Sequence, residues 1–440
     1  MNLSTRKPMK QFFNRADEPT RRQFMQNAAR AYLGVHLFPM LGPSIASAAA
    51  EGAAKGQKAK HVIYLYMSGG MSHLDTFDPK PRKKDVMGPT ETIVGKGEVE
   101  ISGFLPKTAG VTDKMCIINS LNSTQGAHEQ GSYIMHHSYS QRGTIKHPAL
   151  GSWVMKLGGR LNPEIPGFVA INSNPDVTGG GFFGAKYSAA PIGRPDQGLQ
   201  DSKRPDAVSE DDFSRRLSLA DRLNTKFHER YPNADVKAYE ELYREAISLM
   251  NSEDLKAFDL AKEDRETRDL YGSGNFAQGC LLARRLIEHD VRFVEVQLGG
   301  WDTHYDNFTA VEGRCQEFDQ AYAALLTDLD KRGKLKDTLV VVATEFGRTP
   351  TIKIEHSNGR DHHPSAFSCV LAGGGVKGGM KYGKTDSSGE RIKDDEVSVQ
   401  DFNATIAYAL GLPHDLVLMS PTKRPFKIAD KGSPVKSIFG

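Results

Sequence analysis

Short apolar runs recur along the chain, and helical patterns separate several of them. The runs contain four to seven residues and are rich in β-branched and aromatic side chains. They cover residues 61–67, 115–119, 168–171, 292–298, 338–344 and 367–372. Apolar runs of this length and composition predict buried β-strands.

Three segments, 276–290, 307–333 and 401–410, carry apolar residues at helical spacing. In the second, apolar side chains recur three and four residues apart from Phe318 to Leu329, which predicts one buried face. Asp401 is expected at the start of the third helix, as its N-terminal cap or as an acid in its first turn. Apolar strands that alternate with helices are typical of a mostly parallel sheet covered on both faces. We therefore predict an α/β fold.

The middle of the chain has a different character. Residues 211–271 are highly charged and helical in pattern. We interpret the segment from about residue 196 to residue 275 as a solvated helical insertion or cap, rather than as a second domain with its own core. The sequence thus predicts a single α/β domain over residues 61–440.

The N-terminus has the pattern of a targeting segment. Residues 20–25, Thr-Arg-Arg-Gln-Phe-Met, resemble a twin-arginine signal, and a moderately apolar stretch (28–45) and small residues (46–50) follow. We predict a signal peptide over residues 1–50, a linker over 51–60, and a periplasmic or secreted protein exported by the twin-arginine machinery. Prolines and an arginine leave the apolar stretch too short to cross about 30 Å of hydrocarbon, so no stable membrane span is expected.

Charge and cysteine content exclude several classes of protein. The net charge of +3 comes from the first fifty residues, which hold seven Lys or Arg against two acids. The rest of the chain therefore lacks the basic surface that a nucleic-acid partner requires. Its four cysteines form no C-x-x-C pair, which excludes zinc-ribbon and thioredoxin-type sites. Cys116 and Cys369 lie in apolar runs and are expected to be buried free thiols.

Candidate chemistry lies in the loops that follow the predicted strands, where open α/β sheets place their sites. Asp302 and His304 follow the strand at 292–298. Two residues apart on an extended segment, their side chains point to the same side, as metal ligands must. The alternative is that Asp302 caps the next helix while His304 packs against Trp301.

Glu345 follows the apolar run at 338–344, and its carboxylate needs a cation or a donor there. An ion pair with Arg348 would meet that need, but Arg348 could equally clamp an anion. His362 and His363 precede the last apolar run. Adjacent residues of an extended chain face opposite ways, so at most one of these histidines is expected in a common site, while the other orients a neighbour or packs.

Ser123, Thr124 and His128 follow the run at 115–119 and are expected near a helix start, where backbone amides favour anions. They are candidates for the nucleophile of a reaction at this edge of the sheet. The alternative for the two hydroxyl residues is ordinary helix capping.

Six motifs resemble, in this order, those of the DUF1501 family, which is itself similar to the sulfatase and alkaline phosphatase superfamily. They are VIYLYMSGGMSHLDTFDPKP, GGWDTHYDNF, TLVVVATEFGRTP, GRDHHP, LAGGGVKGG and VQDFNATIAYALGL. The resemblance implies an alkaline-phosphatase-like α/β fold with metal ligands among Asp302, His304, Glu345 and His362 or His363. It places His128 near the nucleophile position of sulfatases. The C-x-P-x-R motif is missing, which argues against a formylglycine sulfatase.

These observations lead us to expect an exported metal-dependent hydrolase of sulfate or phosphate esters. A divalent cation such as Zn, Ca or Mn would polarise a small anionic ester, or a sulfated or phosphorylated glycan. Ser123, Thr124, His128 or a water would attack, and Arg348 would neutralise the charge that develops. Two alternatives remain: a catalytically degenerate envelope protein that uses the pocket to bind a glycan or a partner, and a structural protein without metal.

Overall fold

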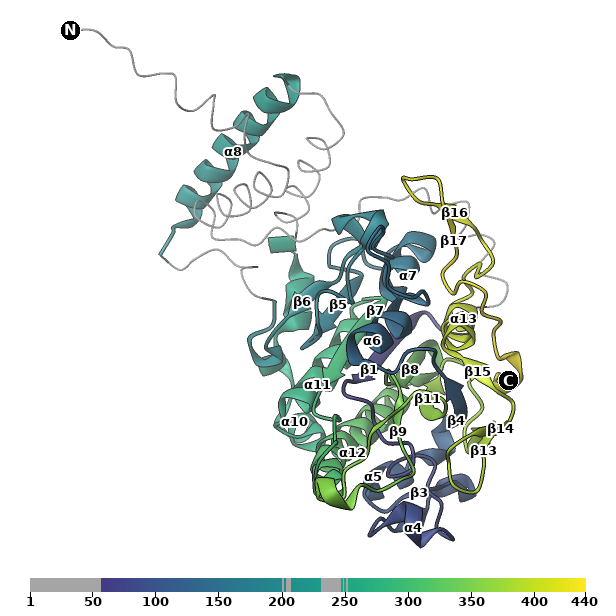
Figure 1. The fold of residues 1–440 in the computed structure, drawn as a ribbon. Coiled ribbons are helices and arrows are strands. Elements are labelled where there is room, and N and C mark those ends of the chain that lie inside the picture. Colours follow the sequence, from purple (N-terminus) through teal and green to yellow (C-terminus); the bar gives the residue numbers. More distant parts are fainter. Residues whose placement is uncertain (1–56, 200–201, 203–206, 231–246, 248, 251) are drawn as a thin grey trace, which may run out of the picture.

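The computed structural model describes residues 57–199, 202, 207–230, 247, 249–250 and 252–440. The predicted signal peptide and most of the predicted linker lie outside these residues. The described part contains a nine-stranded sheet with helices on both faces (Figure 1).

The central sheet is mostly parallel, as the sequence predicts. Its strand order is β12-β4-β11-β8-β1-β7-β5-β6, with β15 beside β4. The strands are β1 (His61–Met67), β4 (Met115–Asn122), β5 (Phe168–Ile171), β6 (Ala190–Ile192), β7 (Phe293–Leu298), β8 (Thr338–Ala343), β11 (Phe367–Gly373), β12 (Met380–Tyr382) and β15 (Val397–Ser398). Within this sheet, β11 runs antiparallel to both of its neighbours, and the other pairs are parallel.

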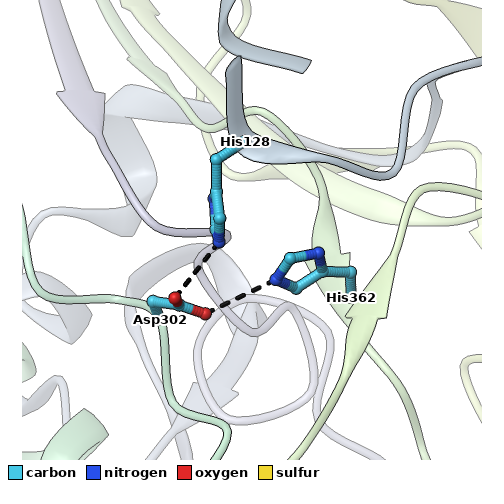
Figure 2. A group of neighbouring side chains, drawn as sticks. All are labelled: His128, Asp302 and His362. Atoms are coloured by element: carbon cyan, nitrogen blue, oxygen red, sulfur yellow. Dashed lines mark ion pairs between the residues drawn. The ribbon is translucent and has the colours of Figure 1, made fainter. Parts of the chain in front are cut away.

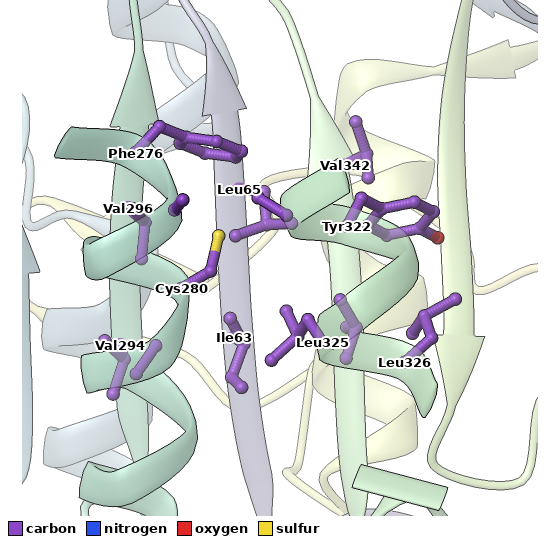
Figure 3. Packing of buried hydrophobic residues seen from close by; sticks show 14 of the residues in the cluster. Ile63, Leu65, Phe276, Cys280, Val294, Val296, Tyr322, Leu325, Leu326 and Val342 are labelled. Carbon is purple, nitrogen blue, oxygen red and sulfur yellow. The ribbon is translucent and has the colours of Figure 1, made fainter. Parts of the chain in front are cut away.

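Alternate side chains of the central strands enter two separate cores, which explains why these strands are mostly apolar. On β1, Ile63 and Leu65 face one core while Val62 and Tyr64 face the other. The first core lies under α11 (Asn275–Glu288) and α12 (Asn307–Lys331) (Figure 3). The second lies under α6 (His128–His137), α7 (Leu150–Gly158) and α13 (Val399–Ala409).

The predicted helices form close to their expected limits. α12 buries the apolar face that runs from Phe318 to Leu329. At the start of α13, Ser398 is the N-cap and forms a capping box with Asp401, so Asp401 is the first-turn acid rather than the cap.

Smaller elements surround the sheet. They are α4 (Lys84–Met87), β2 (Thr92–Val94), β3 (Glu100–Ser102), α5 (Pro106–Ala109), α8 (Glu210–Arg230), α10 (Arg265–Tyr271), β9 (Gly347–Arg348), β10 (His362–His363), β13 (Lys384–Thr385), β14 (Ile392–Asp394), β16 (Leu418–Met419) and β17 (Pro425–Phe426). α8 and α10 lie in the predicted insertion, part of which is outside the described residues. None of the described helices combines the length and the apolar character that a membrane crossing needs.

All four cysteines are buried free thiols, as the sequence predicts for Cys116 and Cys369. Burial raises the pKa of the Cys116 thiol to about 12 and also raises that of Cys369. Because the thiolate is the reactive form, these side chains act as small apolar groups of the core.

The direction of β11 determines where the candidate chemistry gathers. Since β11 is antiparallel to β8, the loop that precedes β11 lies at the edge where β1, β7 and β8 end. A short antiparallel pair, β9 with β10, joins the loop after β8 to the loop before β11. Four segments that are distant in the sequence therefore meet at the carboxyl ends of these strands. They are the loops after β1, β7 and β8 and the loop before β11.

Candidate metal centre

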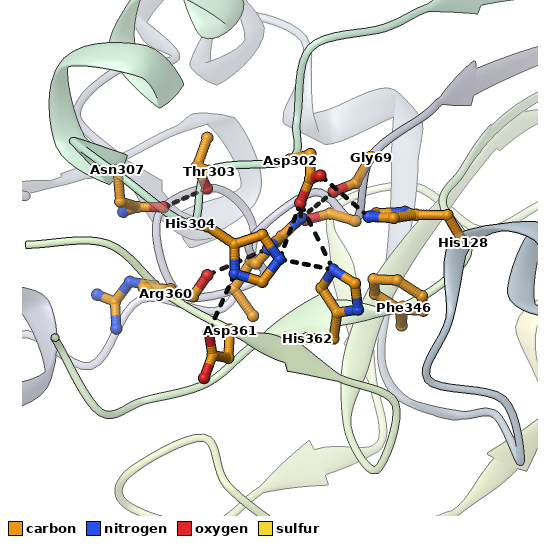
Figure 4. Close-up of polar contacts among 12 residues, drawn as sticks. Gly69, His128, Asp302, Thr303, His304, Asn307, Phe346, Arg360, Asp361 and His362 are labelled. Carbon is orange, nitrogen blue, oxygen red and sulfur yellow. Dashed lines mark hydrogen bonds and ion pairs between the residues drawn. The ribbon is translucent and has the colours of Figure 1, made fainter. Parts of the chain in front are cut away.

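Four side chains converge at this edge: His128 at the start of α6, Asp302 and His304 after β7, and His362 on β10 (Figures 2 and 4). The Asp302 carboxylate is at their centre. Its Oδ2 lies 3.2 Å from His128 Nε2, and its Oδ1 lies 3.2 Å from His304 Nε2 and 3.5 Å from His362 Nε2. The Nε2 atoms of His304 and His362 are 2.9 Å apart. His128, Asp302 and His362 offer ligand atoms that all lie within 4.8 Å of one another.

Each of the three imidazoles has an acceptor at its other nitrogen. The contacts are His128 Nδ1 to Glu345 Oε1 at 2.8 Å, His304 Nδ1 to Asp361 Oδ1 at 3.0 Å and His362 Nδ1 to Gly126 O at 2.7 Å. A carboxylate or carbonyl oxygen in this position assigns the ring proton of a neutral imidazole to Nδ1 and leaves a lone pair on Nε2. Three such lone pairs therefore point toward one carboxylate. The buried Nε2 of His128 makes no hydrogen bond to any described residue.

Arg348 holds the central carboxylate in place. Its fully buried guanidinium donates from Nη2 to Asp302 Oδ1 at 2.6 Å and to Gly69 O, from Nε to Gly70 O at 2.9 Å, and from Nη1 to Arg360 O at 3.1 Å. Four of its five N–H groups are thus used. Burial tends to raise the pKa of Asp302, but the hydrogen bond and charge of Arg348 outweigh it and lower this pKa to about 2. Asp302 is therefore a carboxylate throughout the physiological range.

Glu345 lies behind His128 rather than beside Asp302. Its buried carboxylate accepts hydrogen bonds from Gly69 N at 2.8 Å and from the Tyr66 hydroxyl at 3.0 Å, in addition to its contact with His128. The hydrogen bond with Glu345 raises the pKa of His128, although burial opposes this. Tyr66 has no counterpart in the sequence analysis, because a tyrosine within a buried strand is indistinguishable from a core residue.

Asp361 is the acceptor at Nδ1 of His304, as Glu345 is at Nδ1 of His128. A hydrogen bond from Lys353 lowers the pKa of Asp361, while burial acts in the opposite direction. Its position beside two histidines in the sequence was a usable signal for this role. The two alternatives considered from the sequence are not what the structure contains: the N-cap of α12 is Asp306 rather than Asp302, and Arg348 pairs with Asp302 rather than with Glu345.

The remaining candidates lie apart from the four converging side chains. On β10, His363 faces away from His362, as strand alternation requires, and its Nε2 lies 2.7 Å from Glu390 O. The hydroxyls of Ser123 and Thr124 accept hydrogen bonds within their own loop, from the backbone N–H and side-chain amide of Gln125. We call His128, Asp302, His304 and His362 the convergent group. Among the described residues, none of these three candidates makes a hydrogen bond or an ion pair with it.

Gly69 is the glycine on which this arrangement depends most. Its φ of +120° is a conformation that other residues rarely adopt, and an added Cβ would lie 2.5 Å from the Asp302 backbone nitrogen. Gly69→Ala is expected to lower the free energy of unfolding by about 1–3 kcal/mol, because the added Cβ would displace the backbone of Asp302. Gly299→Ala is the matched control, since nothing lies within 4 Å of its Cβ position. Urea unfolding checks both variants, and equal stability would contradict this role.

Comparison with solved structures finds similarity at low sequence identity. Three solved structures are similar to it: the C-terminal periplasmic domain of EcEptC from Escherichia coli in complex with Zn (8% identity, 82% of this chain and 85% of that chain, TM-score 0.40), the PsFucS1 sulfatase from Pseudoalteromonas sp. (12%, 86% and 74%, 0.38), and a TAB5 alkaline phosphatase mutant with Mg (12%, 74% and 95%, 0.33). At these identities and TM-scores, the likeness carries no argument about the activity of this chain. No curated protein matches the chain.

The model of one family, described as a protein of unknown function (DUF1501), matches residues 59–439. This range contains every helix and strand of the described structure. It also contains all of the convergent side chains. The chain therefore belongs to the DUF1501 family, as the order of its motifs predicted.

Proposed function

We propose that His128, Asp302, His304 and His362 hold one divalent cation, and that the protein uses it to hydrolyse sulfate or phosphate esters. One observation carries the proposal: three imidazole Nε2 atoms face a single carboxylate while an acceptor occupies each Nδ1. Without a cation or extra protons, these lone pairs and the carboxylate repel one another. Histidines that ligate metals almost always donate their other N–H to a carboxylate or a carbonyl.

The donor set fits some metals better than others. Three imidazole nitrogens and one carboxylate oxygen are the ligands that zinc and neighbouring transition metals prefer. Calcium takes six to eight oxygen ligands, for which this group has too few. Of the three metals considered from the sequence, we therefore favour zinc, with manganese next.

The residues around the four ligands have positioning roles in this proposal. A divalent cation held there supplies Lewis-acid polarisation of an ester oxygen. Glu345 and Asp361 orient His128 and His304 through their Nδ1 protons. Arg348 orients Asp302, and with a single N–H left it cannot clamp an anion with two parallel bonds.

The convergent group is open to a substrate. The side chains of His304 and Asp302 are 34% and 48% exposed, so an ester has access to this side of the group, whereas the Nε2 of His128 is buried. Since the hydroxyls of Ser123 and Thr124 are bonded within their own loop, we assign the attack to water. The substrate class is an anionic ester, and sulfated or phosphorylated glycans belong to it. Export by the twin-arginine machinery is also part of the proposal and rests on residues 20–25.

A second candidate function is a metal-holding protein that binds an anionic ligand without turnover. It is favoured by the position of the two hydroxyls, which leaves no side-chain nucleophile in the convergent group among the described residues. The test is a screen of aryl sulfate and aryl phosphate esters with the chain loaded with zinc or manganese. Hydrolysis that disappears in His304→Ala supports the enzyme. Stoichiometric metal without turnover supports the binding protein.

Glu345→Gln is expected to weaken zinc binding by about 10–100-fold, the usual effect of losing a carboxylate behind a ligating histidine. The amide keeps the size of the side chain, so the protein should still fold. Glu129→Gln, one residue after His128 on the exposed side of α6, is the matched control. Zinc titration by calorimetry measures both, and equal affinities in the two variants would show that Glu345 does not support the ligand.

Zinc affinity is also expected to fall when the pH is lowered through the pKa of His128. Cation and proton compete for the same Nε2, and the hydrogen bond with Glu345 raises the pKa of this histidine. Binding therefore begins to weaken at a higher pH than an ordinary histidine would cause. Glu345→Gln removes the negative charge and should move the loss to lower pH. Titrations between about pH 5 and 8 measure this shift; identical profiles for the variant and the natural protein would refute it.

A further inference from the structure

A pocket of about 760 Å³ lies beside the edge strand β12 of the sheet, between β4, β12 and the β13–β14 hairpin. Four lysines and three aspartates supply its charged lining. None of the four proposed metal ligands is among its lining residues. A pocket with several cations and few apolar side chains suits a polar, charged ligand.

One of the three carboxylates in the pocket is already satisfied. Asp78 is buried and accepts from Lys80 Nζ at 2.9 Å and Asn119 Nδ2 at 3.1 Å, both on its Oδ1, while Thr385 Oγ1 donates to its Oδ2. The Asp78–Lys80 pair is therefore close to neutral. Asp394 and Asp395 are exposed at the rim, where solvent screens their charge.

Lys381 is the unusual member of the lining. It is partly buried, and its ammonium makes no hydrogen bond or ion pair with any described residue. Burial lowers its pKa, and the charge of Asp78 offsets this only in part. The ammonium lacks a partner among the described residues, and an anion in the pocket would supply one. Lysines with this combination of burial and position in a cleft mark candidate binding sites.

The walls of the pocket are held firmly. β12 pairs with β4 and sets Lys381 opposite Ile117. The turn after β12 lies directly against β4, because Gly383 has a φ of +67° and a Cβ there would lie 1.9 Å from Ser120 Oγ. The same Ser120 hydroxyl donates to Asp395 O, beyond the end of β14. Both ends of the hairpin thus lie close to one residue of the sheet, and one of them is hydrogen-bonded to it.

The hairpin also contacts the strand that carries a proposed metal ligand. His363 Nε2 lies 2.7 Å from Glu390 O in the turn of the hairpin, whereas His362 faces the convergent group. β10 therefore has the hairpin on one face and the candidate metal centre on the other. The pocket and the candidate metal centre are therefore separate sites, connected through the hairpin and β10.

We propose that this pocket binds an oxyanion group, a sulfate, phosphate or carboxylate, with the ammonium of Lys381 as its main contact. Lys384 and Lys393 are exposed at the rim, as are Asp394 and Asp395, so the charges at the rim offset one another and Lys381 is the main cationic contact. Asn119 and Thr385 of the same lining donate to Asp78, which keeps that carboxylate satisfied and leaves Lys381 to the anion. The proposal goes beyond the proposed hydrolase and does not depend on it, because no metal takes part in this site.

The test is calorimetric titration of the metal-loaded chain with sodium sulfate, sodium phosphate and sodium acetate, against sodium chloride of equal ionic strength. At least one oxyanion is expected to bind in excess of chloride. Lys381→Gln should weaken that binding about tenfold, which is the loss of one charge-assisted hydrogen bond. Lys336→Gln, an exposed lysine outside the pocket, should leave it unchanged. The three salts also show which oxyanion is preferred.

A second variant keeps the proposal testable if Lys381→Gln folds poorly. In Lys381→Met, the rise in Tm that sulfate or phosphate gives the natural protein relative to chloride should disappear. Unchanged oxyanion binding in the Lys381 variants overturns the proposal, as does the lack of any oxyanion effect beyond that of chloride. Neither result affects the metal centre, whose loss would appear as lost zinc binding instead.

Discussion

Asp302→Ala is expected to lower zinc affinity by more than about 100-fold, because even groups that only support a ligand are worth 10–100-fold. The Asp302 carboxylate is the atom group that all three Nε2 atoms approach. It also balances the charge of Arg348, whose Nη2 is 2.6 Å away. Without it, a cation would meet three neutral imidazoles and an uncompensated guanidinium. Calorimetric titration with zinc measures the loss.

Two neighbouring histidines provide a sharp control for this result. His362→Ala is expected to weaken zinc binding in the same way, whereas His363→Ala, one position along the chain, should bind zinc like the natural protein. The difference arises because strand alternation turns His363 toward Glu390 O. Equal losses in both histidine variants, or full affinity in Asp302→Ala, would refute the proposed ligand set.

Arg360→Ala is expected to lower the free energy of unfolding by about 3–5 kcal/mol, the usual cost of leaving one partner of a buried ion pair alone. Arg360 and Asp75 are both fully buried, with Arg360 Nε 2.9 Å from Asp75 Oδ2. The same guanidinium donates to Thr349 O and Pro350 O. Its removal would leave the buried Asp75 carboxylate without its countercharge and the carbonyls of Thr349 and Pro350 without this donor. Urea unfolding measures the change.

Arg265→Ala serves as the comparison for that variant. Its side chain is 89% exposed and lies 3.4 Å from the exposed Asp269, so solvent already screens the pair. No measurable change in unfolding free energy is expected. If Arg360→Ala were equally harmless, the buried pair would not be what joins the loop after β1 to the segment before β10.

The fold was largely predictable because its central strands are buried on both faces. A strand such as β1 is buried at every position and apolar after its first residue, His61, so its limits are visible in the sequence. The short strands β6 and β12 were not predicted, since three residues carry too little pattern. The antiparallel direction of β11 was also not predictable. It depends on hydrogen bonds between segments that are distant in the chain.

The candidate site was predictable only in part. Asp302 and His304 were marked by their spacing after a strand, and alternation limited the site to one histidine of the 362–363 pair. Which histidine enters depends on the register of β10 against β9, which no local pattern records. The sequence placed Glu345 among the metal ligands and His128 among the nucleophile candidates, whereas in the structure His128 faces Asp302 and Glu345 contacts the other side of its ring. This arrangement likewise depends on tertiary packing. Tyr66 contributes a hydroxyl from a position that local sequence assigns to the core.

X-ray absorption at the zinc edge of the protein loaded with one equivalent of zinc tests the central proposal most directly. Three imidazole nitrogens at about 2.0–2.1 Å and a carboxylate oxygen at about 2.0–2.2 Å are expected. The imidazole signal should lose one nitrogen in His304→Ala and stay intact in His363→Ala. A spectrum of water oxygens alone, or one that is the same in all three proteins, would contradict a metal centre built from these four side chains.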